Sequence, residues 1–115
     1  MYPIAKFDNY KLKYGDRITR GAPAIIIFHA DKNAEEHTNN SLIYTTYAML
    51  TAQSLGLGAS IIGIVPPAIN KVKKVKTIFK IPKQYEAIMA VIVGFPKIHY
   101  QRTIKRVLPI IHLIE

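Results

Sequence analysis

The longest uncharged stretch of this chain decides most of what it can fold into. Between Thr38 and Asn70 there is no Asp, Glu, Lys or Arg, which is longer than the roughly 20 apolar residues that cross a bilayer as a helix. Polar residues and glycines nevertheless interrupt the stretch throughout: Asn39, Asn40, Gln53, Ser54, Gly56, Gly58 and Ser60. Polar groups are costly inside lipid and glycine breaks a helix, so we predict a buried helix and a buried strand rather than a membrane span.

The first half of that stretch predicts a long helix. Asn39–Ser41 offer side-chain oxygens that can cap the first exposed amides. Gly56 and Gly58 can end the helix, since glycine accepts the left-handed conformation found at helix C-termini. The apolar residues in between fall on nearly all sides: Leu42, Ile43, Tyr44, Tyr47, Ala48, Met49, Leu50, Ala52 and Leu55. We therefore expect a long buried helix, in which Ala48 and Ala52 permit the close approach of another element.

Three apolar runs predict β-strands, at Ala22–Ala30, Ala59–Val65 and Ala87–Val93. They are rich in β-branched residues and lack polar alternation, which is typical of strands covered on both faces. Between the second and third runs, Ala68–Phe79 carries apolar residues at three- and four-residue spacing with lysines in the intervals. This pattern predicts one amphipathic helix with a basic outer face.

The order strand, helix, strand, helix, strand predicts an α+β fold with a three-layer, α/β/α-like arrangement of helices on a central sheet. We expect residues 1–20 to form an irregular approach segment and residues 21–115 to form one domain. The strands have more apolar surface than these helices can cover. A further portion of chain or a second subunit is therefore expected to cover the rest.

The chain carries a formal charge of +9, which suits nucleic acid, an acidic membrane surface or a phosphorylated cofactor. Many of these charges are the lysines of Lys71–Lys83. No stacking aromatic interleaves them except Phe79, which falls on the apolar side, and no nucleic-acid-binding motif surrounds them. We interpret these lysines as a solvated helix face and expect neither nucleic acid nor a membrane as a partner.

Cysteine and histidine usage argues against a metal centre. The chain has no cysteine, so it has neither disulfides nor thiolate ligands. The four histidines lack the spacing of metal ligands: His29, His37, His99 and His112. The absence of cysteine fits a cytoplasmic protein, and we expect no signal peptide because charges follow the first residues at once.

Three segments resemble the FMN-dependent nitroreductase family in order and spacing. Gly21–Ala30 is similar to the family's Gly-Ala-Pro entry into a central strand. Tyr47–Gly63 resembles its long central helix, its Ser-Leu-Gly-Leu-Gly turn and the strand that reaches the flavin. Val93–Pro96 resembles its Gly-Tyr-Pro motif, which is followed by a basic tail that corresponds here to Tyr100, Arg102 and Arg106. Together the three segments are fairly specific for that family.

The resemblance implies the C-terminal half of a nitroreductase protomer, with a nitroreductase-like but incomplete central sheet around the long buried helix. Two family features have no counterpart in the sequence. One is the N-terminal motif rich in arginine and serine that grips the phosphate and ribityl chain of FMN. The other is an asparagine-bearing loop beside the flavin ring.

The resemblance also implies which residues would bind FMN. The backbone amides of Ile61, Ile62 and Gly63 would lie near N5 and O4 of the flavin ring, and glycine would permit close approach. Arg102, Lys105 and Arg106 would bind the phosphate. From the residues alone, an ordinary strand end and a solvated basic tail stay open as alternatives.

By the same resemblance, the chain is an enzyme in which FMN takes hydride from NAD(P)H and passes electrons to a nitro, quinone or related small-molecule acceptor. The flavin supplies the chemistry, so we expect no catalytic side chain. Family members are dimers in which the central helix packs against its partner and C-terminal segments wrap across it. We therefore expect a homodimer or higher oligomer, in agreement with the apolar C-terminal end: Val107, Leu108, Pro109, Ile110, Ile111, Leu113 and Ile114.

A function of another class stays open. Because the N-terminal cofactor motif is missing, the chain can also be interpreted as a truncated, flavin-free remnant that acts as an interaction or structural module. A flavin absorbance spectrum separates the two functions, since only the enzyme binds FMN.

Overall fold

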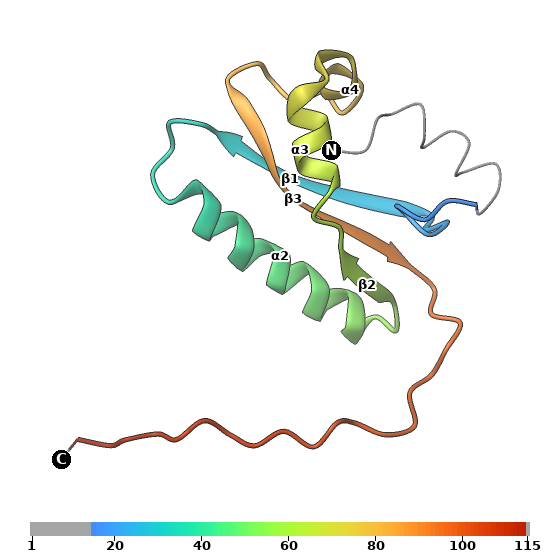
Figure 1. Ribbon diagram of the computed structural model, residues 1–115, viewed down its shortest axis with the longest axis vertical. Helices are drawn as coiled ribbons and strands as arrows, with labels where there is room; N and C mark the ends of the chain where they lie inside the picture. The colour runs from blue at the N-terminus through green and yellow to red at the C-terminus, as the bar shows by residue number, and fades with distance from the viewer. Residues whose placement is uncertain (1–14, 115) are drawn as a thin grey trace.

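A computed structural model describes residues 15–114 of the chain, so most of the approach segment predicted at residues 1–20 lies outside the described residues. Its elements follow in the order β1 (Ala24–Asp31), α2 (His37–Ser54), β2 (Gly58–Ile61), α3 (Val65–Lys71), α4 (Lys73–Ile78) and β3 (Tyr85–Gly94). Each predicted strand is present, with ends shifted by a few residues. Figure 1 shows α2 running alongside the sheet, with α3 and α4 in the upper part of the view.

The described strands form one antiparallel sheet in the order β1-β3-β2. The pairing of β1 with β3 runs from Ala24 opposite Val93 to Asp31 opposite Tyr85. β2 pairs with the last residues of β3, from Gly58 opposite Gly94 to Ile61 opposite Val91. The strand that comes last in the sequence is therefore the central one. Of the three described strands, only β3 has buried residues. All residues of the edge strands β1 and β2 are half-buried or exposed.

Side chains of β3 alternate between the two faces of the sheet. Tyr85 and Ala87 pack with Ile69 of α3 in the core cluster. Glu86, which lies between them, accepts a hydrogen bond from His37 at the start of α2, with 3.1 Å between Nε2 and Oε1. Helices α2 and α3 therefore lie on opposite faces, which confirms the three-layer α+β arrangement.

Helix α2 begins at His37, earlier than predicted. Glu36 precedes it in a left-handed conformation (φ 52°), and no side chain caps the first amides. The predicted cap at Asn39–Ser41 is wrong, because these residues are already helical and the Ser41 hydroxyl donates to the His37 carbonyl at 2.7 Å. The start is instead held by the His37 ring, whose Nδ1 lies 2.8 Å from the Ala34 carbonyl oxygen and whose Nε2 contacts Glu86.

The predicted helix stop is confirmed. Gly56 has a φ of 74°, and its amide donates to the Gln53 carbonyl at 3.0 Å while the Leu57 amide donates to the Ala52 carbonyl at 2.8 Å. These two bonds form the Schellman motif, which needs a left-handed residue and so favours glycine. The motif turns the chain directly into β2.

The burial of α2 differs from the prediction that it is buried nearly all round. Only Ser41, Thr45 and Ala52 are buried. These small residues face the sheet, and the Thr45 hydroxyl is satisfied by the Ser41 carbonyl at 2.7 Å. The large apolar side chains are directed away and are exposed: Leu42, Ile43, Tyr44, Tyr47, Leu50 and Leu55. Within the described chain nothing covers that side of the helix, so one face alone is buried.

The single basic helix predicted at Ala68–Phe79 is wrong, since two short helices, α3 and α4, meet at Val72, which is extended (φ −108°, ψ 100°). Ile69, Val75 and Ile81 all pack on one cluster, and the bend at Val72 brings these three side chains to the same place. Pro66-Pro67 opens α3, because proline is tolerated in the first turn of a helix.

Lys76 departs from the predicted solvated face. Its Nζ donates to the carbonyl oxygens of Lys83, at 3.0 Å, and Tyr85, so it closes the turn that leads into β3. We expect Lys76→Met to lower the free energy of unfolding by about 1.5 kcal/mol, because two hydrogen bonds to a charged donor are lost. The matched change Lys74→Met, at an exposed position, should alter it by less than about 0.5 kcal/mol. Chemical denaturation of both variants measures the difference; equal effects would mean that the Lys76 bonds do not contribute.

A turn stabilised by Asp16 leads into β1. The carboxylate accepts from the amides of Ile18 (3.0 Å), Thr19 (2.9 Å) and Gly21 (3.3 Å), and from the Thr19 hydroxyl. These bonds, the Thr19 hydroxyl first, lower the pKa of Asp16 from 3.8 to about 2. A lowered pKa means that the carboxylate supports the turn above pH 3.8 and that this support is lost as the pH falls towards 2.

An NMR titration of the Asp16 carboxyl carbon should therefore have its midpoint near 2. Thr19→Val removes the hydroxyl donor while keeping the side-chain shape, and should move the midpoint towards the ordinary value of 3.8. A midpoint that is the same in both proteins would contradict this assignment of the cause.

The C-terminal segment, residues 95–114, has no helix or strand, and its residues are exposed. Figure 1 shows it leaving the end of β3 as an extended chain. The radius of gyration is accordingly 17.6 Å, against about 13 Å for a compact domain of this length. The apolar residues of this segment are thus left uncovered by the described chain.

Candidate cofactor site

The turn predicted to lie beside the flavin connects the end of β2 to α3. The Ile62 side chain is buried, and its amide donates to the Ala90 carbonyl at 2.9 Å. The Ile62 amide is therefore already used by β3. Neighbouring amides of an extended strand point to opposite sides, so the Ile61 amide is directed away from β3, towards the outer edge of the sheet.

Gly63 is exposed, and a Cβ built on it would meet nothing within 4 Å. Among the described residues, its amide has no hydrogen-bond partner. Two of the three predicted amides, those of Ile61 and Gly63, are thus available to a ligand at the edge of β2. Backbone donors in this arrangement can stabilise negative charge that develops on a ring heteroatom. The Ile62 amide is bonded to Ala90 and is not available in the same way; flavin binding by these three residues stays a prediction.

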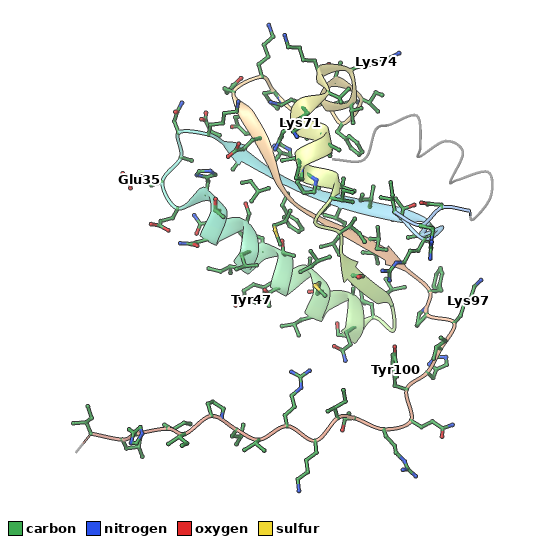
Figure 2. All side chains as sticks on the ribbon, viewed as in Figure 1. Glu35, Tyr47, Lys71, Lys74, Lys97 and Tyr100 are labelled. Atoms are coloured by element: carbon green, nitrogen blue, oxygen red, sulfur yellow. The ribbon has the colours of Figure 1, made fainter. Side chains whose placement is uncertain are left out.

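The three residues predicted to bind phosphate lie elsewhere. Arg102, Lys105 and Arg106 are all exposed and belong to the extended C-terminal segment. Figure 2 shows this segment passing Lys97 and Tyr100 and then running apart from the sheet. Within one chain, the structure does not bring the three basic residues to the turn at Ile61–Gly63. Their role in phosphate binding stays a prediction.

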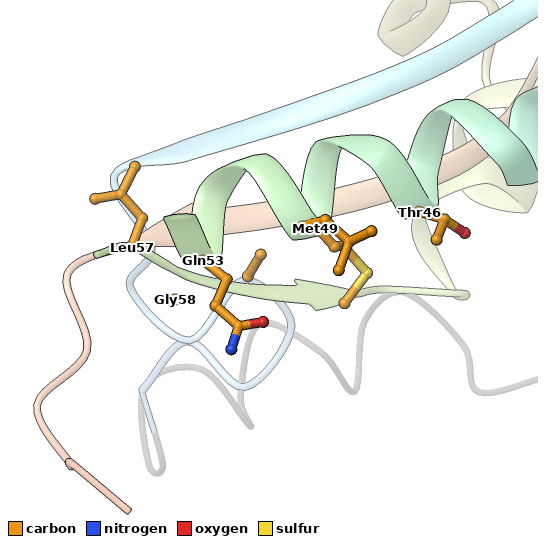
Figure 3. Close-up of a pocket in the computed structure, with 7 residues that line it drawn as sticks. Thr46, Met49, Gln53, Leu57 and Gly58 are labelled. Atoms are coloured by element: carbon orange, nitrogen blue, oxygen red, sulfur yellow. The ribbon is translucent and has the colours of Figure 1, made fainter. Parts of the chain in front are cut away.

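A hollow of about 410 Å³ lies between α2 and β2. Figure 3 shows Thr46, Met49 and Gln53 of α2 on one side and Leu57 and Gly58 on the other. Leu50 and Ala59 complete the lining. Its volume is in the range of small-molecule sites, and it adjoins the same strand as the turn at Ile61–Gly63. Sequence reasoning missed this hollow, because no single residue in the sequence signals it.

Neither a metal centre nor a membrane span is found in residues 15–114. No group of three His, Asp or Glu side chains is placed to hold an ion. No helix in the same residues is long and apolar enough to cross a membrane.

Comparison with known protein families gives one match. A family model described as the nitroreductase family matches residues 4–95. Among curated proteins, none matches the sequence.

Several solved structures share the fold. A nitroreductase with bound FMN from Bacteroides fragilis NCTC 9343 superposes with a TM-score of 0.71 at 15% identity over 93% of this chain. One from Desulfitobacterium hafniense DCB-2, also with bound FMN, gives 0.70 at 18% over 92%. An FMN-dependent nitroreductase from Clostridium difficile R20291 gives 0.66 at 21% over 96%. The chain covers 60%, 58% and 67% of these three structures, respectively.

Proposed function

Because this chain belongs to the nitroreductase family, we propose that it forms part of an FMN-dependent oxidoreductase, with NAD(P)H as electron donor and a nitro, quinone or related compound as acceptor. The observation that carries the proposal is the outer edge of β2, where the Ile61 amide is directed away from β3 and the Gly63 amide has no hydrogen-bond partner among the described residues. The fold shared with two structures that contain FMN supports the choice of cofactor.

The residues at this edge would hold and orient the cofactor. FMN, when bound, would supply the transfer of hydride and electrons. The Ile61 and Gly63 amides would donate to the heteroatoms of the ring edge, and the absence of a side chain on Gly63 would let the ring approach the backbone. The bond from Ile62 to Ala90 would keep both donors in place. Arg102, Lys105 and Arg106 would bind the phosphate through charge-assisted hydrogen bonds.

A second copy of the chain is part of the proposal. α2 directs its small residues to the sheet and its large apolar residues outward, the reverse of a helix that only covers its own domain. Tyr47, which points away from the sheet in Figure 2, is 67% exposed. Packing α2 against a partner would cover this face, and the apolar C-terminal segment could then lie across the partner.

The enzymatic proposal is tested by reduction of the bound flavin. The purified chain, supplied with FMN and freed of excess, is mixed anaerobically with NADH or NADPH while the visible flavin absorbance is followed. We expect one of the donors to bleach the flavin and a quinone or nitroaromatic acceptor to restore the absorbance. Bound flavin that neither donor reduces would contradict the proposed electron donor.

A second function, a flavin-free interaction or structural module, is favoured by a different observation. The basic residues that would bind phosphate do not meet the turn at Ile61–Gly63 within one chain. A protein that retains no FMN but still dimerises would support this module over the enzyme.

A further inference from the structure

The side chain of Asn70 pairs with the part of β3 that β2 does not reach. Its Nδ2 donates to the Ala87 carbonyl at 2.7 Å, and its Oδ1 accepts from the Ala87 amide at 2.8 Å. The carboxamide thus makes the same pair of bonds that a residue of a neighbouring antiparallel strand would make. β2 itself pairs with β3 only as far as Val91, with one further bond from Ile62 to Ala90.

The pairing is needed because β2 ends before it reaches Ala87. The register with β1 shifts by one residue, since Phe28 lies opposite Met89 and His29 lies opposite Ala87. This bulge leaves Ile88 without a partner in β1, and the amide and carbonyl of Ala87 are directed towards Asn70. Ala87 is buried, at 4% exposure, so its amide and carbonyl would be costly to leave without partners. Asn70 satisfies both groups.

A residue before α3 and one near its end are therefore both bonded to β3. Ile62 is bonded to Ala90, and Asn70 is bonded to Ala87. Between them α3 is stiffened by Pro66-Pro67 in its first turn and held by Ile69, which is 1% exposed. Rotation of α3 away from the sheet would carry Gly63 with it, because only Ile64 separates Gly63 from the helix.

We propose that Asn70 is a positioning residue for the turn at Ile61–Gly63. By locking α3 onto β3 at the bulge, it fixes the direction of the Ile61 and Gly63 amides before any ligand binds. Such preorganisation strengthens binding because less ordering is needed when the ligand arrives. The link to FMN rests on the proposed function, whereas the positioning of the turn does not.

The test compares Asn70→Ala with Asn40→Ala in the full chain. Asn40 lies in α2, is exposed, and its side-chain amide makes no hydrogen bond within the described residues. Amide hydrogen exchange is measured first without flavin. In Asn70→Ala we expect the Ile62 amide to exchange roughly tenfold faster, while the β1–β3 amides change only as much as global stability does. Asn40→Ala should leave Ile62 unchanged.

FMN affinity of the same proteins is the second measurement, and we expect a loss of about tenfold for Asn70→Ala alone. Unchanged exchange at Ile62 would overturn the positioning role, as would a change spread evenly over the sheet. Faster exchange at Ile62 in a protein whose unaltered form binds no FMN would support the positioning role and reject the flavin site.

Discussion

Tyr47→Glu is expected to convert a dimer of this chain into monomers. Tyr47 lies on the side of α2 that the chain leaves uncovered, at 67% exposure, so the change should cost the isolated fold little. In the proposed dimer the same position is covered, and a buried carboxylate without a partner is strongly unfavourable. A penalty of about 3 kcal/mol raises the dimer dissociation constant on the order of 100-fold. Analytical ultracentrifugation over a range of concentrations measures it.

Ile78→Glu is the matched control for this result. Ile78 is apolar and 69% exposed, but it lies on α4 rather than α2. The same charge introduced there should leave the association unchanged. If both variants dissociate alike, general repulsion or misfolding is responsible; if Tyr47→Glu stays as dimeric as the unaltered chain, α2 is not the interface.

Arg106→Ala is expected to weaken FMN binding by roughly 10- to 100-fold, since a charge-assisted hydrogen bond from a guanidinium to phosphate is worth about 1.5–3 kcal/mol. Lys71→Ala removes one positive charge as well, but from α3, and should change the affinity by less than about twofold. Equilibrium titration followed by flavin fluorescence compares the two. Equal losses would mean that overall charge, rather than a contact at Arg106, attracts the cofactor.

The contact proposed between Arg106 and the phosphate also depends on where the C-terminal segment lies. It lies in the extended segment that leaves its own sheet, so the contact requires the segment to fold against a partner or back on the chain. If a partner provides the surface, Arg106→Ala should have almost no additional effect in the monomeric Tyr47→Glu protein. A full additional loss would mean that Arg106 binds FMN within its own chain.

Local signals in the sequence predicted the elements of the fold well. Gly56 ends α2 because the Schellman motif needs a left-handed residue, and three apolar runs without polar alternation became strands. The helix start was mispredicted because the bonds that fix it come from outside the helix. The His37 ring reaches Glu86, which lies 49 residues further along the chain.

The other differences also have non-local causes. The basic helix bends at Val72 because three side chains on either side of the bend pack in one cluster, and this cannot be read from helical spacing. The apolar pattern of α2 indicated burial but could not indicate which residues face the sheet. Small residues do so here, and the large ones are exposed.

The candidate site was predictable only in part. The family motif pointed to Ile61–Gly63, but the register with β3 decides which amides are available, and that register is a property of the folded sheet. Asn70 gave no signal in the sequence, because its role depends on where β2 ends along β3. The hollow between α2 and β2 likewise arises from the packing of two elements.

The most direct measurement is an NMR titration of the isotope-labelled chain with FMN, in which the backbone amide shifts are followed. We expect saturable changes that are largest at Ile61 and Gly63 and smaller at Ile62, whose amide stays bonded to Ala90. The absence of saturable changes, or changes confined to the lysines of α3 and α4, would contradict a flavin site at the edge of β2.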